Sequence, residues 1–549
     1  MRFIVIGALA TGAVLAVAAA GNAQAPAHDD HAGHGRGLGK LGKVTFPISC
    51  APEAGRRFER AMAVLHSFWW EEGDAAFNRV LEAESDCAMA YWGLAMNAWG
   101  NPFAGGPTGP ALSRGAEAAA TAWSLYPDSR RERGFIAAVA ALYRDAEIIP
   151  NSVRLQAYAD TMARLARDFP KDTEVAIYYA LSLIATAPKT DTTFAQQKRA
   201  ALILNPLFAR NPQHPGLAHY IIHSTDSPQM ARHGLSAARR YARIAPAAPH
   251  AQHMPSHIFI RLGYWDETVA SNWVAFRAGV ANARAKDVPP AGEVLHALDY
   301  AVYGYLQRGQ DSAARAAVDT GQNAGVLEGK GIVGDYNRTA MAARIPLETG
   351  DWKAAAAFPV AEVQGVGTQA MLSRFTRAIG AARSGDPEAA RAEVVELHLI
   401  AKRIAELGEP YWSRVARIKH QAAWAWIVFA GGDTANGLAH AREAADSEEV
   451  TDKHPVTPAE LLPARELLGD MLLAAGRYGE AREAYGATLA REPGRARSIF
   501  GAARAAELAG DRAAARIGYR EFLKLMIKGD GARPEVVTAK TFLRDTRDT

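Results

Sequence analysis

Apolar and small residues recur along this 549-residue chain at the spacing of amphipathic helices, and runs that favour strands are few. The pattern is clearest in residues 464–493, with the sequence ARELLGDMLLAAGRYGEAREAYGATLAREP. Its landmarks return in the following unit, because Gly476 and Gly510, like Tyr485 and Tyr519, are separated by 34 residues. A fixed period of this length predicts a repeated helix–turn–helix unit. We therefore expect an all-α fold, an α-solenoid of stacked antiparallel helix pairs.

The residues of this unit suit two closely packed helices. Small residues such as Gly469 let the helices approach, and the ring of Tyr485 fills the gap between them. Gly476 ends the first helix because glycine tolerates a left-handed backbone, and Pro493 ends the second. The chain resembles the tetratricopeptide repeat (TPR) family in these positions, and the resemblance covers roughly residues 50–527.

Weaker copies of the unit place glycines at matching positions, namely Gly73, Gly263, Gly309, Gly350 and Gly385. Their spacing drifts beyond 34 residues, which predicts longer helices or inserted loops. The Gly/Pro-rich stretches 100–110 and 281–293 are either such surface insertions or functional loops. The TPR resemblance implies a superhelix whose concave groove is lined by the first helix of each pair and binds a protein or peptide partner.

The chain ends are expected to lie outside the solenoid. Residues 1–23 read as a secretory signal peptide, with Arg2 followed by a long apolar stretch, so we expect a periplasmic or secreted protein. Residues 24–49 are expected to be a linker, and residues 528–549 a C-terminal tail. The linker carries His28, His31 and His34, which either capture metal weakly or are simply solvated.

Composition excludes some kinds of partner. The net charge is only +4, and no basic stripe with interleaved aromatic residues is present, so nucleic acid is not expected to bind. No later segment has the roughly 20 apolar residues of a membrane span, so stable membrane insertion is not expected after signal cleavage.

The only two cysteines, Cys50 and Cys87, precede or open helices of adjacent repeats. An oxidising compartment permits a disulfide between them, and stacking would bring these helix ends together. The alternative is two separate buried thiols.

The chemistry of the chain is concentrated in the histidine-rich segment 214–300. His219 and His223 are four residues apart, as are His253 and His257, and the two pairs are offset by 34 residues. Residues four apart share one helix face, and equivalent positions of neighbouring repeats lie side by side. We therefore expect these four side chains to converge on one transition-metal ion.

Further residues extend this row. His250 precedes the second pair, and counting back from the closing glycines aligns His296 with His250, Asp299 with His253, and Tyr303 with His257. His250, His296 or Asp299 is thus expected near the metal. Nitrogen-rich ligation without cysteine suits Zn, Cu, Ni or Fe.

Alternatives to this metal centre remain open. The histidines could instead recognise a peptide in the groove, or serve only in packing. A metal with a vacant position would make the protein a metal-dependent enzyme, with Tyr303 or Asp299 as the proton-transfer candidate. The motif is not H-E-x-x-H, which disfavours a zincin peptidase.

Several other residues that stand out in the sequence are assigned different roles. Asp226 is expected to cap a helix with Ser227, and Pro255 is expected to delay or kink the helix that carries the second histidine pair. His66, with Glu71 and Glu72 close behind, either faces the groove or is part of a solvated helix end, and the second interpretation is preferred.

Overall fold

A computed structural model describes residues 38–188, 190–329, 331–531 and 533–545. The predicted signal peptide, residues 24–37 of the predicted linker and the histidines at positions 28, 31 and 34 lie outside the described residues. Within the described residues the secondary structure is helical, without a strand, which confirms the predicted all-α class.

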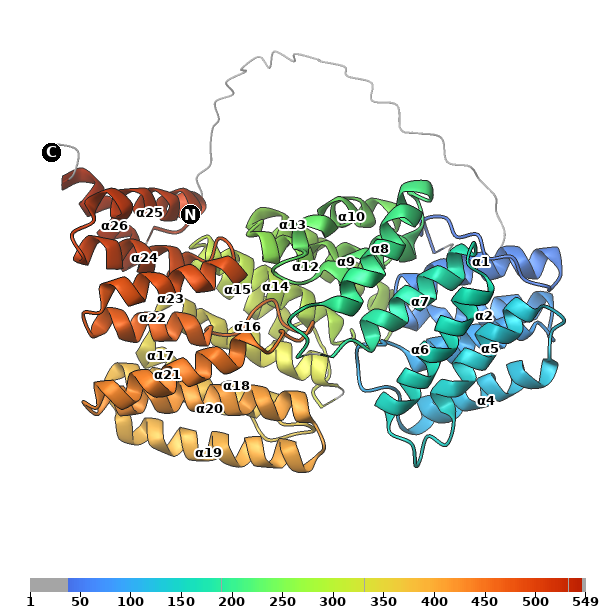
Figure 1. The fold of residues 1–549 in the computed structure, drawn as a ribbon, viewed down its shortest axis with the longest axis horizontal. Coiled ribbons are helices and arrows are strands. Elements are labelled where there is room, and N and C mark those ends of the chain that lie inside the picture. Colours follow the sequence, from blue (N-terminus) through green and yellow to red (C-terminus); the bar gives the residue numbers. More distant parts are fainter. Residues whose placement is uncertain (1–37, 189, 330, 532, 546–549) are drawn as a thin grey trace, which may run out of the picture. The chain divides into compact units, whose positions relative to one another are not determined.

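The helices follow one another along the chain in the order of their labels in Figure 1. The first group is α1 (Pro52–His66), α2 (Trp70–Ala83), α3 (Ala88–Trp99), α4 (Gly109–Leu125), α5 (Arg130–Tyr143), α6 (Asn151–Asp168), α7 (Thr173–Ala185) and α8 (Ala195–Arg210). The second group is α9 (Pro215–Thr225), α10 (Ala231–Ile244), α11 (Pro249–His253), α12 (Pro255–Leu262), α13 (Trp265–Ala285), α14 (Glu293–Gln307), α15 (Asp311–Gln322), α16 (Ile332–Thr349) and α17 (Trp352–Ala356). The third group is α18 (Thr368–Ser384), α19 (Pro387–Glu406), α20 (Pro410–Ala430), α21 (Thr434–Glu449), α22 (Ala464–Ala474), α23 (Tyr478–Arg491), α24 (Ala496–Leu508), α25 (Arg512–Leu525), the short 3₁₀ helix η1 (Met526–Lys528) and α26 (Pro534–Asp545).

Consecutive helices pack against one another, and each pair also contacts the next, as a solenoid requires. The turns between paired helices use the predicted glycines. Gly263, Gly309, Gly350, Gly385, Gly476 and Gly510 all have a positive φ, between 64° and 91°. The tight contact predicted around Tyr485 is also present, since a Cβ atom on Gly469 or Gly501 would lie 2.8 or 2.4 Å from its ring. These local features confirm the TPR-like helix pairs.

The first pair departs from this pattern. Gly73 lies inside α2, where a Cβ atom would collide with Asn97, so its predicted place at a turn is wrong. The turn between α1 and α2 is made by Phe68, whose φ is 51°. A bulky residue rarely adopts this left-handed conformation, which costs roughly 1–3 kcal/mol and persists only where the surroundings impose it.

Both predicted boundaries of the solenoid need correction. Residues 39–49 are not a free linker, because Leu41, Val44 and Phe46 are buried and the backbone N–H of Lys43 donates to the Gln213 carbonyl. The predicted tail contains α26, which packs on α25 through Val536, Ala539 and Phe542. The solenoid therefore includes residues before 50 and after 527.

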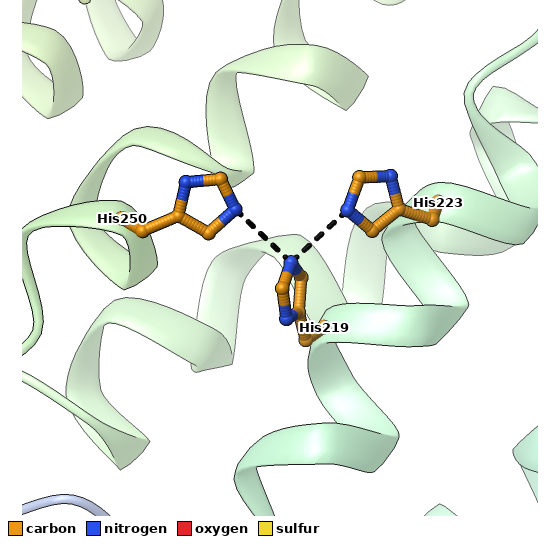
Figure 2. A group of neighbouring side chains, drawn as sticks. All are labelled: His219, His223 and His250. Atoms are coloured by element: carbon orange, nitrogen blue, oxygen red, sulfur yellow. Dashed lines mark hydrogen bonds between the residues drawn. The ribbon is translucent and has the colours of Figure 1, made fainter. Parts of the chain in front are cut away.

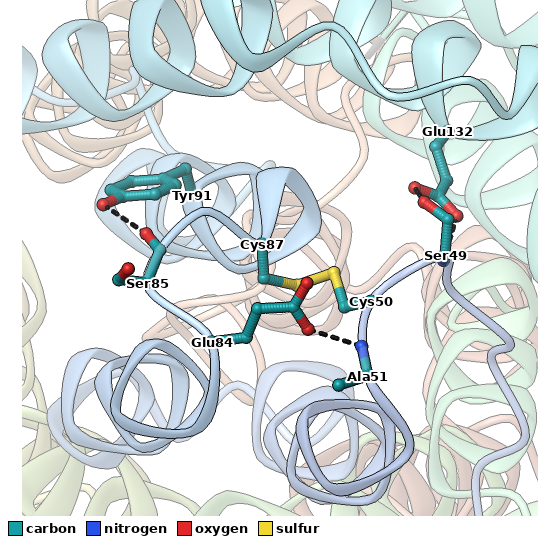
Figure 3. Close-up of a disulfide and its surroundings, with 8 residues drawn as sticks. All are labelled: Ser49, Cys50, Ala51, Glu84, Ser85, Cys87, Tyr91 and Glu132. Atoms are coloured by element: carbon teal, nitrogen blue, oxygen red, sulfur yellow. Dashed lines mark hydrogen bonds between the residues drawn. A yellow bond between two sulfur atoms is a disulfide. The ribbon is translucent and has the colours of Figure 1, made fainter.

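Cys50 and Cys87 form a disulfide, with Cα atoms 5.6 Å apart (Figure 3). Cys50 precedes α1, and Cys87 is the N-terminal cap of α3. Glu84 accepts a hydrogen bond from the Ala51 N–H, and Glu132 accepts one from the Ser49 N–H at 2.6 Å. The disulfide and two carboxylates thus hold the chain as it enters α1.

Residues 451–463, between α21 and α22, form a non-helical segment that packs on helices far earlier in the sequence. Asp452 pairs with Arg261 of α12, and Thr457 accepts a hydrogen bond from Arg344 of α16. We call this stretch the 451–463 segment. It brings the C-terminal half of the chain against the histidine-rich helices. Among the described residues, no helix combines the length and apolarity needed to cross a bilayer.

Candidate metal centre

Six of the histidines of segment 214–300 lie on four helices. His219 and His223 lie on α9, His250 and His253 on α11, His257 on α12, and His296 on α14. The helix break predicted at Pro255 is present, because α11 ends at His253 and α12 starts at Pro255. The break separates the two histidines of the second pair onto two short helices.

The structure arranges these six histidines as two groups of three. The first triad is His219, His223 and His250; the second triad is His253, His257 and His296. Within each triad the possible ligand atoms lie within 4.8 Å of one another. The expectation that two pairs surround a single point is therefore corrected: each pair takes its own third histidine, His250 or His296.

In the first triad the three Nε2 atoms point toward one another (Figure 2). The Nε2 atoms of His223 and His250 lie 3.0 and 3.2 Å from Nε2 of His219. A tetrahedral zinc site with bonds of about 2.0–2.1 Å places its ligand nitrogens about 3.3–3.4 Å apart. The two observed separations are slightly shorter than this value, so a small expansion would accommodate an ion.

The tautomer of His219 is set by its other nitrogen. Its Nδ1 lies 2.7 Å from the carbonyl oxygen of His66 and must donate, because a carbonyl only accepts. That carbonyl is available because His66 is the last residue of α1, where helix carbonyls lack partners. Nε2 of His219 therefore presents one lone pair to two neighbouring nitrogens. That lone pair can accept a hydrogen bond along its axis from only one of these two nitrogens, whereas a metal ion can bind the Nε2 lone pairs of all three histidines.

The second triad is more strongly constrained. Nε2 of His253 lies 3.0 Å from Nε2 of His257. Every Nδ1 atom faces an oxygen: Asn272 Oδ1 at 2.6 Å for His253, Asp226 Oδ2 at 2.9 Å for His257, and the Val456 carbonyl at 3.0 Å for His296. Each Nδ1 thus donates, and each neutral ring keeps its lone pair on Nε2.

The orientation of Asn272 supports this assignment. Its amide nitrogen donates to the Thr268 carbonyl at 2.7 Å, so its oxygen must be the atom that faces His253. The 3.0 Å contact between His253 and His257 then brings two lone pairs together. Such a contact is unfavourable without a cation between the nitrogens. Oxygen partners on the distal nitrogens are also what orients histidine ligands in metal sites.

Burial keeps these rings neutral. Burial, followed by the neighbouring histidines, lowers the pKa of His219, His250 and His296 well below the usual value of 6.5. The same causes, burial first and then His257, lower the pKa of His253 to about 3. Burial also lowers the pKa of His257. Neutral imidazole is the form that binds metal, so these histidines do not have to lose a proton before they bind a metal ion at neutral pH.

Asp226 does not have the role predicted for it, since no side chain caps α10. Its carboxylate instead accepts from His257 and forms ion pairs with Arg261 at 2.8 Å and Lys453 at 3.4 Å. Burial alone would raise the pKa of Asp226, but Lys453, Arg261 and His257 together hold it well below 3.8. The ionised carboxylate therefore fixes His257 from behind, and Lys453 of the 451–463 segment joins the same network.

Aromatic side chains surround the triads. The ring centre of Phe68, from the left-handed turn, lies 4.4 Å from that of His219. Phe103, from the predicted insertion 100–110, lies 4.4 Å from His223. Tyr300 packs against His253 at 4.8 Å. Phe68 and Tyr220 also line an apolar pocket of about 430 Å³, a volume that includes the open space at its mouth.

A third group, His66, Glu174 and His214, was not anticipated from the sequence. Glu174 accepts from Nε2 of His66 at 3.0 Å and from Nε2 of His214 at 2.8 Å. Nδ1 of His66 contacts the Tyr220 hydroxyl, and Nδ1 of His214 accepts a hydrogen bond from the Leu217 N–H. Every ring nitrogen in this group has a complementary partner, so the group is complete without an ion.

This third group also corrects the interpretation of His66, which is fully buried and not part of a solvated helix end. Burial alone would raise the pKa of Glu174, but His214 and His66 outweigh it and lower the pKa to about 2. Glu72 is also buried and pairs with Lys286 at 2.6 Å, while Glu71 is exposed.

Asp299 and Tyr303 do not join the triads. Asp299 forms a fully buried ion pair with Arg344 at 2.6 Å, and Tyr303 hydrogen-bonds Glu492 at 3.1 Å. The face of α14 toward the histidines carries His296 and, one turn later, Tyr300. The alignment of α14 with α11 and α12, obtained by counting back from the turn glycines, therefore placed the wrong residues beside the histidines. The break at Pro255 shifts the helical positions before it, and the continuous helix α14 has no such break.

Comparison with known proteins adds little to this description. No family model matches the chain, and no curated protein matches it significantly. The crystal structure of yeast Tom70 aligns over 90% of this chain and 96% of its own, at 11% identity and a TM-score of 0.26. The structure of Naa15/Naa10 bound to HypK-THB aligns over 90% and 74%, at 11% identity and 0.22. A circular tandem repeat protein aligns over 90% and 99%, at 14% identity and 0.12. These likenesses carry no argument about function, and the fold assignment rests on the helix pairs themselves.

Proposed function

We propose that this protein is an exported helical-repeat scaffold that binds transition-metal ions at the first and second triads. The observation that carries the proposal is the second triad, where oxygen partners on all three Nδ1 atoms leave the lone pairs on Nε2, with those of His253 and His257 3.0 Å apart. Three imidazole ligands and no sulfur suit Zn, Cu, Ni or Fe, and coordination geometry distinguishes among these.

The scaffold part of the proposal follows from the helix pairs. Stacked pairs of this kind present extended surfaces to protein or peptide partners. Around the second triad, however, the 451–463 segment already contacts His296, through the Val456 carbonyl. A partner would therefore bind elsewhere along the solenoid. The disulfide supports export, because such bonds persist in oxidising compartments such as the periplasm.

A second candidate function is that of a metal-dependent enzyme with an open coordination position. His223 and His250 of the first triad are only partly buried, which leaves room for a further ligand. The apolar pocket beside Phe68 would then hold the organic part of a substrate. Activity that depends on His223, with pocket variants altering substrate preference, would distinguish this candidate from a purely binding role.

The first test is metal binding by the full chain purified without an added histidine tag and stripped with chelator. After equilibration with Zn²⁺ or Cu²⁺ and dialysis, elemental analysis should find one ion for each triad. His223→Ala should remove one ion, His257→Ala the other, and the double variant both. Ions that remain in the double variant measure binding at other histidines, including those at positions 28, 31 and 34.

The matched control replaces His398 and His420, whose rings lie 5.4 Å apart outside either triad. This variant should keep the full metal content. The proposal fails if the triad variants bind as much metal as the unaltered chain, or if the stripped chain takes up none. Circular dichroism must show unchanged helix content in each variant.

A further inference from the structure

The two triads lie next to each other. The ring centres of His223 and His257, which belong to different triads, lie 6.2 Å apart. His250 and His253 also belong to different triads and are three residues apart on α11, and their ring centres are separated by 6.0 Å. Imidazoles of one triad therefore face imidazoles of the other.

Two ions in these sites would lack compensating charge. The six histidine ligands are neutral, so two divalent ions would bring a charge of about +4 into a buried region. Asp226 contacts His257, but its charge is already offset by Arg261 and Lys453. A buried charge needs a partner, and the available partner is an anion bound at the open metal positions.

We propose that the two triads form one dinuclear centre, in which a small anion bridges the two metal ions. This proposal rests on the proposed metal binding and specifies its ligand: hydroxide in the resting state, replaceable by a linear anion such as azide. Three protein ligands at each ion leave a fourth position for a ligand that the two ions could share, and ions about 3.5–4 Å apart share bridging oxygen ligands in two-metal sites. Phe68 and Phe103 border the first triad with apolar rings.

Copper(II) provides the test, because two bridged Cu²⁺ ions couple magnetically and lose their electron paramagnetic resonance signal. The full chain is stripped, loaded with two equivalents of Cu²⁺, and its integrated signal is compared with its copper content. We expect a signal several-fold below the copper content. His223→Ala and His257→Ala, each with one ion left in a triad, should both recover the full signal per copper.

Azide is then titrated into the same samples and followed by its charge-transfer absorption. It should bind the doubly loaded chain several-fold more tightly than either single variant, while the His398→Ala, His420→Ala control behaves like the unaltered chain. Two bound coppers with a full signal, or equal azide affinities in all samples, would overturn the dinuclear centre but leave metal binding intact. A chain that takes up no copper at either triad would overturn both proposals.

Discussion

At the scale of single residues, the partner of each distal nitrogen decides what a histidine does. His253, His257 and His296 have oxygen acceptors on Nδ1, so their lone pairs lie on Nε2, and those of His253 and His257 face each other. His66 and His214 have the opposite arrangement, because their Nε2 atoms donate to Glu174. The same residue type thus builds a candidate metal site in one place and a closed hydrogen-bond network in another.

The distal partner of His253 provides the first prediction. Asn272→Leu removes the oxygen that fixes the tautomer of His253, and loss of such a partner lowers metal affinity by about 10–100-fold. Asn272→Asp keeps an acceptor and should retain most of the affinity. Competition titration with a chelator of known affinity measures both. Equal affinities for the Leu and Asp variants would show that this hydrogen bond does not support the site.

Asp299 is predicted to act in stability and not in metal binding. Asp299→Ala leaves the fully buried Arg344 guanidinium without its carboxylate, and breaking a buried pair in this way costs about 3–5 kcal/mol. Thermal or urea unfolding should show this loss while metal stoichiometry at low temperature stays unchanged. If Asp299→Ala lost one ion per chain and kept its stability, Asp299 would be a ligand.

The residues of the triads were only partly predictable from sequence. The 34-residue offset identified His219, His223, His253 and His257, since a repeat places equivalent positions side by side. It does not reveal Asn272 or Glu174, because these come from α13 and α7 and follow no shared period with the histidines. Contacts of this kind are set by how the helices pack.

At the scale of elements, two irregular features shape the centre. The break between α11 and α12 allows α11 to supply His250 to the first triad and His253 to the second. The turn at Phe68 takes a conformation that normally requires glycine, and it places an aromatic ring on His219. The glycine turns of the regular repeats were predicted, whereas this one was not, because no glycine marks it.

The disulfide is predicted to stabilise the N-terminal helices in particular. Replacing Cys50 and Cys87 by alanine opens a loop of 37 residues, which costs about 3–4 kcal/mol in the chain-entropy model. Solenoid repeats contact mainly their neighbours, so hydrogen exchange should accelerate in α1–α3 and not in α24 or α25. Uniform acceleration along the chain would show that the solenoid unfolds as one unit.

At the scale of the whole molecule, the regular repeats and the irregular 451–463 segment have different origins. The helix pairs could be predicted from residues such as Gly476 and Gly510, whose spacing reflects local packing. The segment carries no repeat pattern, yet it reaches His296, Tyr300 and Arg344 through backbone oxygens or a threonine side chain. Such a contact across more than 100 residues cannot be read from periodicity.

The buried histidines predict how the stability of the metal-free chain depends on pH. His253 has its folded pKa lowered to about 3, from 6.5 in the unfolded chain. Between pH 6.5 and about 3, His253 is protonated in the unfolded state but neutral in the folded state. The free energy of unfolding therefore decreases as the pH is lowered through this range. Melting temperatures between pH 6.5 and 5, where ordinary carboxylates stay ionised, should decrease, and His253→Gln should reduce the slope. A flat or rising profile would contradict neutral burial of His253.

The central claim is that three histidine Nε2 atoms in each triad hold a metal ion. Anomalous diffraction from crystals of the metal-loaded chain, collected on both sides of the metal absorption edge, tests it most directly. The account predicts a peak about 2.0–2.1 Å from the Nε2 atoms of His253, His257 and His296, and a second peak within the first triad. Fully loaded crystals that show no peak at either triad, or peaks only at other histidines such as His398 and His420, would contradict it.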